Sequence, residues 1–247
     1  MNKIKSLSIS FWFKELKFNP IDKINKLEEY LGNDYLKPLI NNMDINSNLS
    51  IPRYQFISKD NKNIFMGTLI NCNLIFNFKE EMDYNDVILL ANSNMQLYYD
   101  MIKEVYDIDI KYTSLKIEMV NDNDDIINSF VKNNNLPNND YEDLSLKKVI
   151  AKDNTYYLSY IENTGKEVQY NYVIDNNNKP SEQDLFDRSM VMSLSEATSK
   201  KEFLFTIIEI NDRLAYNLDK DYNTTKENIR GMISELKSFL EKEINEY

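Results

Sequence analysis

The alternation of apolar and polar residues near the N-terminus predicts a β-strand. Leu7, Ile9, Phe11 and Phe13 alternate with three serines and Trp12. A period of two is typical of a strand that buries one face and leaves the other face polar. We therefore expect the chain to begin with a half-buried strand.

The same periodicity predicts further strands along the chain. Residues 53–58 and a long arm over 64–78 are expected to form a hairpin around a turn at 60–63. The polar residues 41–50 before this hairpin are interpreted as a connection. Turns are also expected at 163–166, which contains Gly165, and at 198–201. The remaining strands are predicted at 108–120, 144–151, 156–162, 168–174, 189–195 and 202–211.

Three longer amphipathic helices are expected between and after these strands. The first starts at an Asn19 N-cap and ends at Gly32. The second covers 84–106, where Asp83 and Asp86 resemble a capping pair, and the third covers 225–245 behind a capping box of Thr224 and Glu227. A short helix is also predicted at 125–132.

These elements predict an α+β fold, because strands occur in runs and the helices are segregated from them. The sheet is expected to be antiparallel, with about eight or nine strands in two β-rich halves. The predicted halves are 1–132, an N-terminal α+β half, and 144–247, which holds β-hairpins and the terminal helix. An Asn- and Pro-rich linker at 133–143 separates them, and they are compatible with one continuous domain.

The composition excludes several kinds of chemistry. The 247 residues include no histidine, one cysteine and four widely spaced glycines. A Ser-His-Asp triad, a Cys-x-x-Cys zinc or redox site and a glycine-rich phosphate loop are therefore all absent from the sequence. We expect no cofactor and no metal.

Charge and the lack of targeting signals indicate the partners and the compartment. The net charge is −11, which repels nucleic acid and favours basic protein partners. No apolar stretch approaches 18 residues, and residues 1–13 contain no signal-peptide core, so we expect a cytoplasmic protein without a membrane segment. A protein partner is expected, direct contact with nucleic acid is not, and a homo-oligomer stays open.

Three carboxylates are the candidates for catalysis. Glu209 follows Phe203, Phe205 and Ile207 on one face of a predicted strand, where a carboxylate is costly unless it is paired. Asp212 lies just beyond that strand, and Glu118 is a third carboxylate. Together they suggest a metal or acid–base site, whereas a solvated strand end is the simpler interpretation.

Arginines and tyrosines are the candidates for binding. Arg53 and Arg213 lie at strand ends, where an arginine can line a groove and bind carboxylates or phosphates. Five tyrosines, with Tyr157 among them, crowd one predicted hairpin, and the other four are the binding candidates. Cross-strand packing explains such residues, and a protein-binding face is the alternative. The four candidates are Tyr156, Tyr160, Tyr170 and Tyr172.

The order of the elements resembles a sporadically distributed bacterial family of unknown function, about 250 residues long. The resemblance covers most of the chain and lies in the N-terminal strand and in the segments IPRYQFISKDNKNIFMGTLINCNLIFNF, LLANSNMQLYYDMIKEVYDIDI, KYTSLKIEMV, FTIIEIND and TTKENIRGMISELKSFL. The family's C-terminal helix usually carries a histidine, which this chain lacks. The resemblance implies no catalytic residues. SecB-like chaperones are similar in their antiparallel sheet and packed helices, but their length and strand count fit less well.

We therefore expect a non-enzymatic, acidic, cytoplasmic protein-binding module. The excess of Asn, Lys and Ile over Ala, Gly and Arg is typical of AT-rich coding. An inhibitor or accessory factor in phage–host conflict fits this composition, the acidity and the sporadic character of the resembling family. Two alternatives stay open. One is a metal-dependent hydrolase or nuclease that uses the strand-end carboxylates, and the other is a small-ligand sensor.

Overall fold

The structure is a computed structural model that describes residues 3–46, 49–78, 82–121, 145–152, 155–169 and 199–245. The chain divides into two compact units. The larger unit holds 2–119, 147–161 and 206–247, and the smaller holds residue 1, 120–146 and 162–205.

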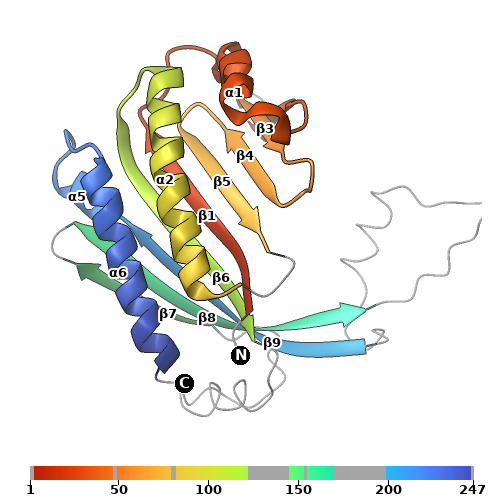
Figure 1. Cartoon of the computed structure of the whole chain (residues 1–247), viewed down its shortest axis with the longest axis vertical. Helices are drawn as coiled ribbons and strands as arrows, with labels where there is room; N and C mark the ends of the chain where they lie inside the picture. Colours follow the sequence, from red (N-terminus) through yellow and green to blue (C-terminus); the bar gives the residue numbers. More distant parts are fainter. Residues whose placement is uncertain are drawn as a thin grey trace, which may run out of the picture. The chain divides into compact units, whose positions relative to one another are not determined.

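Nine strands form one sheet, in the spatial order β2-β3-β4-β5-β1-β6-β9-β8-β7 (Figure 1). The strands are β1 (Lys3–Phe13), β2 (Leu39–Asn46), β3 (Leu49–Ile57), β4 (Asn63–Gly67), β5 (Asn71–Asn77), β6 (Ile110–Asn121), β7 (Ser145–Lys152), β8 (Tyr156–Gln169) and β9 (Ser199–Asn211). The helices are η1 (Pro20–Lys23), α1 (Ile24–Leu31), η2 (Gly32–Asp34), α2 (Tyr84–Tyr106), α5 (Arg213–Leu218) and α6 (Lys226–Asn245).

The sheet is antiparallel, which confirms the predicted α+β class. β1 and β5 pair antiparallel, as do the successive pairs from β2 to β5. On its other side β1 neighbours β6, where Ser6 bonds Glu118 and Trp12 stacks on Tyr112. Six residues forward on β1 therefore match six residues backward on β6, which is an antiparallel arrangement.

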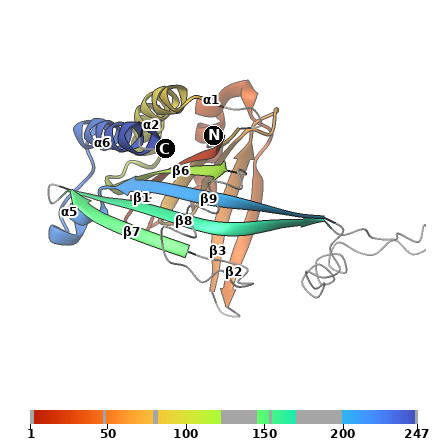
Figure 2. The same ribbon diagram turned by 90° about the horizontal axis from the view of Figure 1, so that it is seen from below.

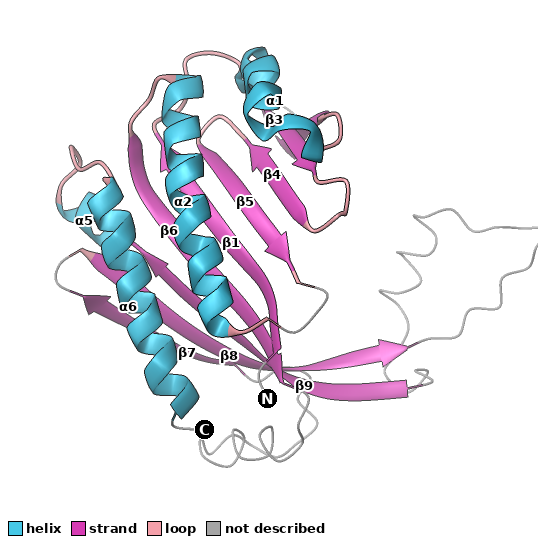
Figure 3. Cartoon of the chain, viewed as in Figure 1, coloured by secondary structure: helices cyan, strands magenta, loops and turns pink. Residues whose placement is uncertain are grey.

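Helices α1, α2 and α6 lie on one side of the sheet (Figures 2 and 3). The core lies between these helices and the sheet. Strand β1 contributes the four apolar residues that its period of two predicted, and all four are buried. The α2 stripe, with Ala91, Met95 and Ile102 at its centre, packs into the same core.

Helix boundaries follow the predicted caps for the first two helices. The Asn19 side chain accepts a hydrogen bond from the Ile21 amide, and Gly32 ends α1 with φ at +66°. Asp83 accepts from the Asn85 amide at the start of α2. Asp107 ends that helix in the left-handed conformation.

The third helix has a different cap from the one predicted. Thr225 and Asn228 form the capping box, because the Asn228 amide donates to Thr225 Oγ1 and the Thr225 amide donates to Asn228 Oδ1. Thr224 is buried, and its hydroxyl donates to Asp212 instead. The predicted box of Thr224 and Glu227 was therefore one residue too early.

Strand β2 and the turn between β4 and β5 correct the sequence prediction. Most of the polar stretch 41–50 belongs to the β2–β3 hairpin, because main-chain pairing with β3 needs no apolar side chains. The long arm 64–78 is two strands, and its phase changes at the turn. Phe65 is buried before the turn, whereas Cys72 and Leu74 are buried after it.

Two predicted turns lie inside strands. β8 continues through 163–166, because a glycine within a strand weakens it without ending it. β9 begins at Ser199, so it includes most of the predicted turn at 198–201. The short helix at 125–132, the linker at 133–143, residues 170–174 of the strand predicted at 168–174, and the strand at 189–195 lie outside the described residues.

Candidate functional site

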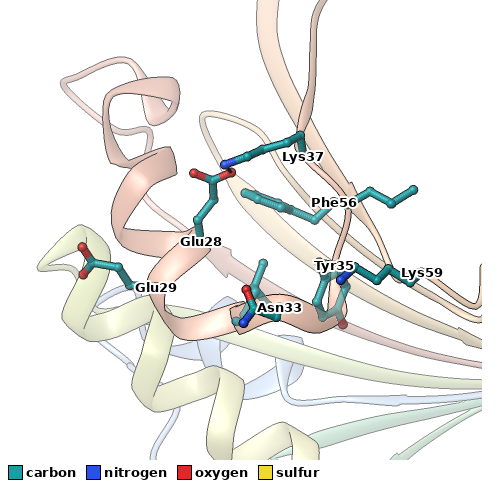
Figure 4. A pocket seen from close by; sticks show the side chains of 10 residues that line it. Glu28, Glu29, Asn33, Tyr35, Lys37, Phe56 and Lys59 are labelled. Atoms are coloured by element: carbon teal, nitrogen blue, oxygen red, sulfur yellow. Dashed lines mark hydrogen bonds and ion pairs between the residues drawn. The ribbon is translucent and has the colours of Figure 1, made fainter.

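A hollow of about 340 Å³ lies between the C-terminal end of α1 and strand β3 (Figure 4). Its apolar lining comes from Leu31, Tyr35, Leu36 and Phe56. Charged and polar residues form the rest of the lining. These are Glu28, Glu29, Asn33, Lys37 and Lys59, with Gly32 between them.

Backbone pairing holds the segment after α1 against the sheet. Tyr35 forms an isolated antiparallel bridge with Ser58, and the Leu36 amide donates to the Ile57 carbonyl. The Lys59 amide donates to the Asp34 carbonyl. The wall of the hollow is therefore an edge segment that leads directly into β2.

Tyr35 is held in place by a contact with Tyr98 of α2. Its hydroxyl lies 3.1 Å from the hydroxyl of Tyr98. Burial raises the pKa of the Tyr35 phenol, and the nearby carboxylates of Asp34 and Asp60 add to this rise. The Tyr98 hydrogen bond acts in the opposite direction but does not cancel it. The ring is therefore a neutral, oriented part of the lining.

One ion pair lies at the rim of the hollow. Lys37 Nζ is 2.9 Å from Glu28 Oε1. The two side chains differ in exposure, since Lys37 is 89% exposed and Glu28 only 28%. In Figure 4 the Glu29 carboxylate points away from this pair. Glu28 therefore belongs to the hollow, whereas Lys37 reaches it from solvent.

The hollow adjoins an exposed apolar edge of the sheet. β2 is the last strand of the order, and within the described ranges it pairs only with β3. Leu39 and Ile40 at its start are 58% and 52% exposed, and Leu36 at the hollow is 49% exposed. An exposed apolar edge strand offers unpaired main-chain groups to a second chain.

Asp212 is the most buried of the three predicted carboxylates, with 0% exposure. Oδ1 accepts from the Thr113 amide at 2.6 Å, while Oδ2 accepts from Thr224 Oγ1 at 2.6 Å and from the Tyr222 hydroxyl at 2.9 Å. Burial raises the pKa of Asp212, and these hydrogen bonds only partly offset the effect. The carboxylate thereby joins β6 to the segment that precedes α6.

Glu209 and Glu118 lie on the sheet face opposite the buried side chains of their strands. Glu209 accepts from Ser114 Oγ at 2.8 Å and from Asn211 Nδ2 at 3.1 Å. Glu118 accepts from Ser6 Oγ at 2.7 Å and from Lys116 Nζ at 2.6 Å. Burial raises the pKa of Glu118, but these two donors outweigh it and the pKa is lowered.

The structure does not assemble these acids into one site. Glu118, Glu209 and Asp212 have separate hydrogen-bond partners. Where side chains are described, no group of three or more Cys, Asp and Glu residues could hold a metal ion. The geometry of the described part therefore gives no support to a metal-dependent hydrolase.

The predicted binding residues are dispersed as well. Arg53 lies in the middle of β3 and not at a strand end as predicted, because the strand begins at Leu49. It donates to Met66 Sδ at 3.4 Å, and the Arg213 guanidinium lies 5.7 Å from the centre of the Tyr112 ring. Tyr156 is buried and donates to the Asn228 carbonyl at 3.0 Å. Tyr160 belongs to β8, whereas 170 and 172, the other two tyrosines, lie outside the described residues.

Sequence reasoning missed the hollow and its edge strand. A signal was present, because Leu36, Leu39 and Ile40 form a short apolar run between the end of α1 and the polar stretch. That run is too short for its periodicity to show whether it forms a strand or a loop. Its exposure became visible only once the strand order was known.

No protein-family model matches the chain, and no curated protein matches it. Within the described ranges, no helix is both long enough and apolar enough to cross a membrane.

Proposed function

We propose that the chain is a non-enzymatic protein-binding module that receives an extended segment of a partner protein along strand β2. The observation that carries the proposal is the exposed apolar edge beside the hollow, formed by Leu36, Leu39 and Ile40. Strand addition uses main-chain hydrogen bonds for affinity and side-chain pockets for specificity. This edge provides both features in adjacent positions.

The magnitude of the apolar contribution supports a measurable effect. Fully burying a leucine or isoleucine contributes about 1.5–3 kcal/mol. Leu39 and Ile40 are each about half exposed, so covering both contributes roughly 2 kcal/mol. Replacing both with lysine is therefore expected to weaken binding by about tenfold or more.

The test compares complexes purified from the native host. The wild-type chain is compared with the double variant Leu39→Lys/Ile40→Lys and with a matched control, Leu89→Lys/Leu97→Lys. The control leucines are 66% and 62% exposed on α2, so both variants add the same charge at comparably exposed apolar positions. Circular dichroism establishes that all three fold.

We expect one protein to co-purify stoichiometrically with the wild type and the control and to be depleted with the edge variant. Hydrogen exchange on the isolated complex should then show slower exchange of β2 amides. The mass of the complex separates a different protein from a second copy of this chain. A stoichiometric partner that the edge variant retains, or no such partner at all, would refute the proposal.

The compartment and biological setting are also proposals. Support for the cytoplasm comes from the single cysteine, which cannot form an intramolecular disulfide. Support for phage–host conflict, and for kinship with the resembling bacterial family, comes from acidity, composition and element order.

A further inference from the structure

We propose that the hollow receives an arginine side chain of the partner, an inference that rests on the proposed strand addition at β2. When a strand is added to an edge, alternate side chains point to the same face of the sheet. The hollow lies beside the edge segment 35–37 and is bounded by α1, so it is within reach of such a side chain. The question is which chemistry it accepts.

The lining of the hollow matches the two parts of an arginine. Leu31, Tyr35 and the exposed Leu36 supply apolar and aromatic surface for the stem and the flat guanidinium. Glu28 supplies a carboxylate that a guanidinium can bind through two parallel hydrogen bonds. A neutral apolar side chain would contact only the apolar and aromatic part of this lining and would leave Glu28 without a new partner.

The position of the Lys37 ammonium shows where a positively charged group can pair with Glu28. This ammonium already contacts Glu28, although the Lys37 side chain is almost entirely in solvent. Exposed ion pairs contribute little, with a median of about 0–1 kcal/mol, so this one is readily exchanged. A guanidinium that arrives from the hollow side would displace Lys37 and bind the less exposed carboxylate.

Lys59 is a second positive charge in the lining, in addition to Lys37. Its ammonium should weaken the binding of any cation, and its removal should strengthen it. At longer range the net charge of −11 favours a basic partner segment. Lys59 in the lining therefore opposes the binding of a cation, whereas the net charge of the whole chain favours it.

The experiment uses small probes, because the partner sequence is unidentified. Nα-acetyl-arginine methylamide is titrated into the isotopically labelled full chain, and amide chemical shifts are followed by NMR. The matched probe is Nα-acetyl-citrulline methylamide, which has nearly the same shape but no charge. We expect saturable shifts at Glu28, Tyr35, Lys37 and Phe56 with the arginine probe and about three- to tenfold weaker binding of the citrulline probe.

Variants identify the groups responsible. Glu28→Gln should weaken the arginine probe by about three- to tenfold, whereas Lys37→Ala and Lys59→Ala should strengthen it. Asp100→Asn is the matched control, because Asp100 also pairs with a lysine, Lys226, at 2.6 Å. It removes the same charge elsewhere and should leave probe binding nearly unchanged.

Equal binding of both probes, an equal effect of E28Q and D100N, or weaker binding to K37A would each overturn the inference. The edge variant separates it from the proposed function. Loss of the partner from L39K/I40K without any arginine preference leaves strand addition standing and removes the arginine site. Arginine binding at the hollow together with full retention of the partner by L39K/I40K removes strand addition.

Discussion

At the residue scale, Asp212 shows how a suspected catalytic acid serves as a structural link. Strand β9 ends beside it, and its carboxylate accepts hydrogen bonds from Thr113, Tyr222 and Thr224. A buried carboxylate is tolerated only when such donors surround it. Those same donors satisfy both of its oxygens, so the site has the properties of a fixed connection.

We predict that Asp212→Ala lowers the free energy of unfolding by about 3–4 kcal/mol, because it leaves the buried donors without an acceptor. Tyr222→Phe removes one donor and should cost about 1 kcal/mol. Glu209→Ala is the comparison, since Glu209 is half-buried, and it should cost less than about 1 kcal/mol. Urea denaturation measures all three, and equal losses at 209 and 212 would contradict this assignment.

At the element scale, helix α6 lies close to strand β8 at a glycine. An ideal Cβ added to Gly231 would lie 2.5 Å from the hydroxyl oxygen of Tyr156 and 3.5 Å from its ring carbon Cζ. That hydroxyl donates to the Asn228 carbonyl on the same helix. The contact therefore requires a glycine because of one oxygen atom.

This geometry predicts a change of sign in a double-mutant cycle. Gly231→Ala in the wild-type background should destabilise the protein by about 1–2 kcal/mol, because the methyl group meets the Tyr156 oxygen. In a Tyr156→Phe background the same change should stabilise it by up to about 1 kcal/mol, since alanine favours the helix. Thermal or urea unfolding measures the cycle, and an unfavourable effect in both backgrounds would refute this explanation.

Element prediction succeeded where a periodic pattern was long and failed where pairing partners decided the outcome. The α2 stripe and its Asp83 cap were readable, because a long amphipathic helix carries its own signal. The turn before Asn71 was missed, since apolar residues continue through it on both faces. β2 was missed because it is a strand only through its pairing with β3, and the residues of β2 alone do not indicate that pairing.

The candidate site also depends on contacts between residues that are far apart in the sequence. The three predicted carboxylates were chosen one by one, and only the register of β1, β6 and β9 shows that each has its own donors. The hollow depends on Gly32 ending α1 and on Tyr35 bridging to Ser58. That bridge joins residues 23 positions apart, so no short motif could reveal it.

At the scale of the whole molecule, the titration behaviour follows from which groups are present. The chain has no histidine, and the other side chains have ordinary pKa values below 5 or above 8. Burial raises the pKa of the thiol of Cys72 to about 12, so that group stays protonated through mild alkali. Net charge and stability should therefore both be nearly constant between pH 6 and 8.

Acidification should lower stability through Glu118. Its pKa is lowered in the folded chain, so its stabilising contribution is complete above the pKa of the unfolded chain and is lost as pH falls through the folded value. Asp212 has the opposite sign, because a raised pKa makes its contribution decline as pH rises above the ordinary value. We predict that the thermal midpoint stays constant within about 2 °C from pH 6 to 8. Below that range the midpoint should fall with pH, and Glu118→Gln should make this fall shallower.

A midpoint that changes steeply between pH 6 and 8, or a fall at acid pH that E118Q leaves unaltered, would contradict this prediction. If the plateau holds, any pH dependence of partner binding in that range originates in the partner.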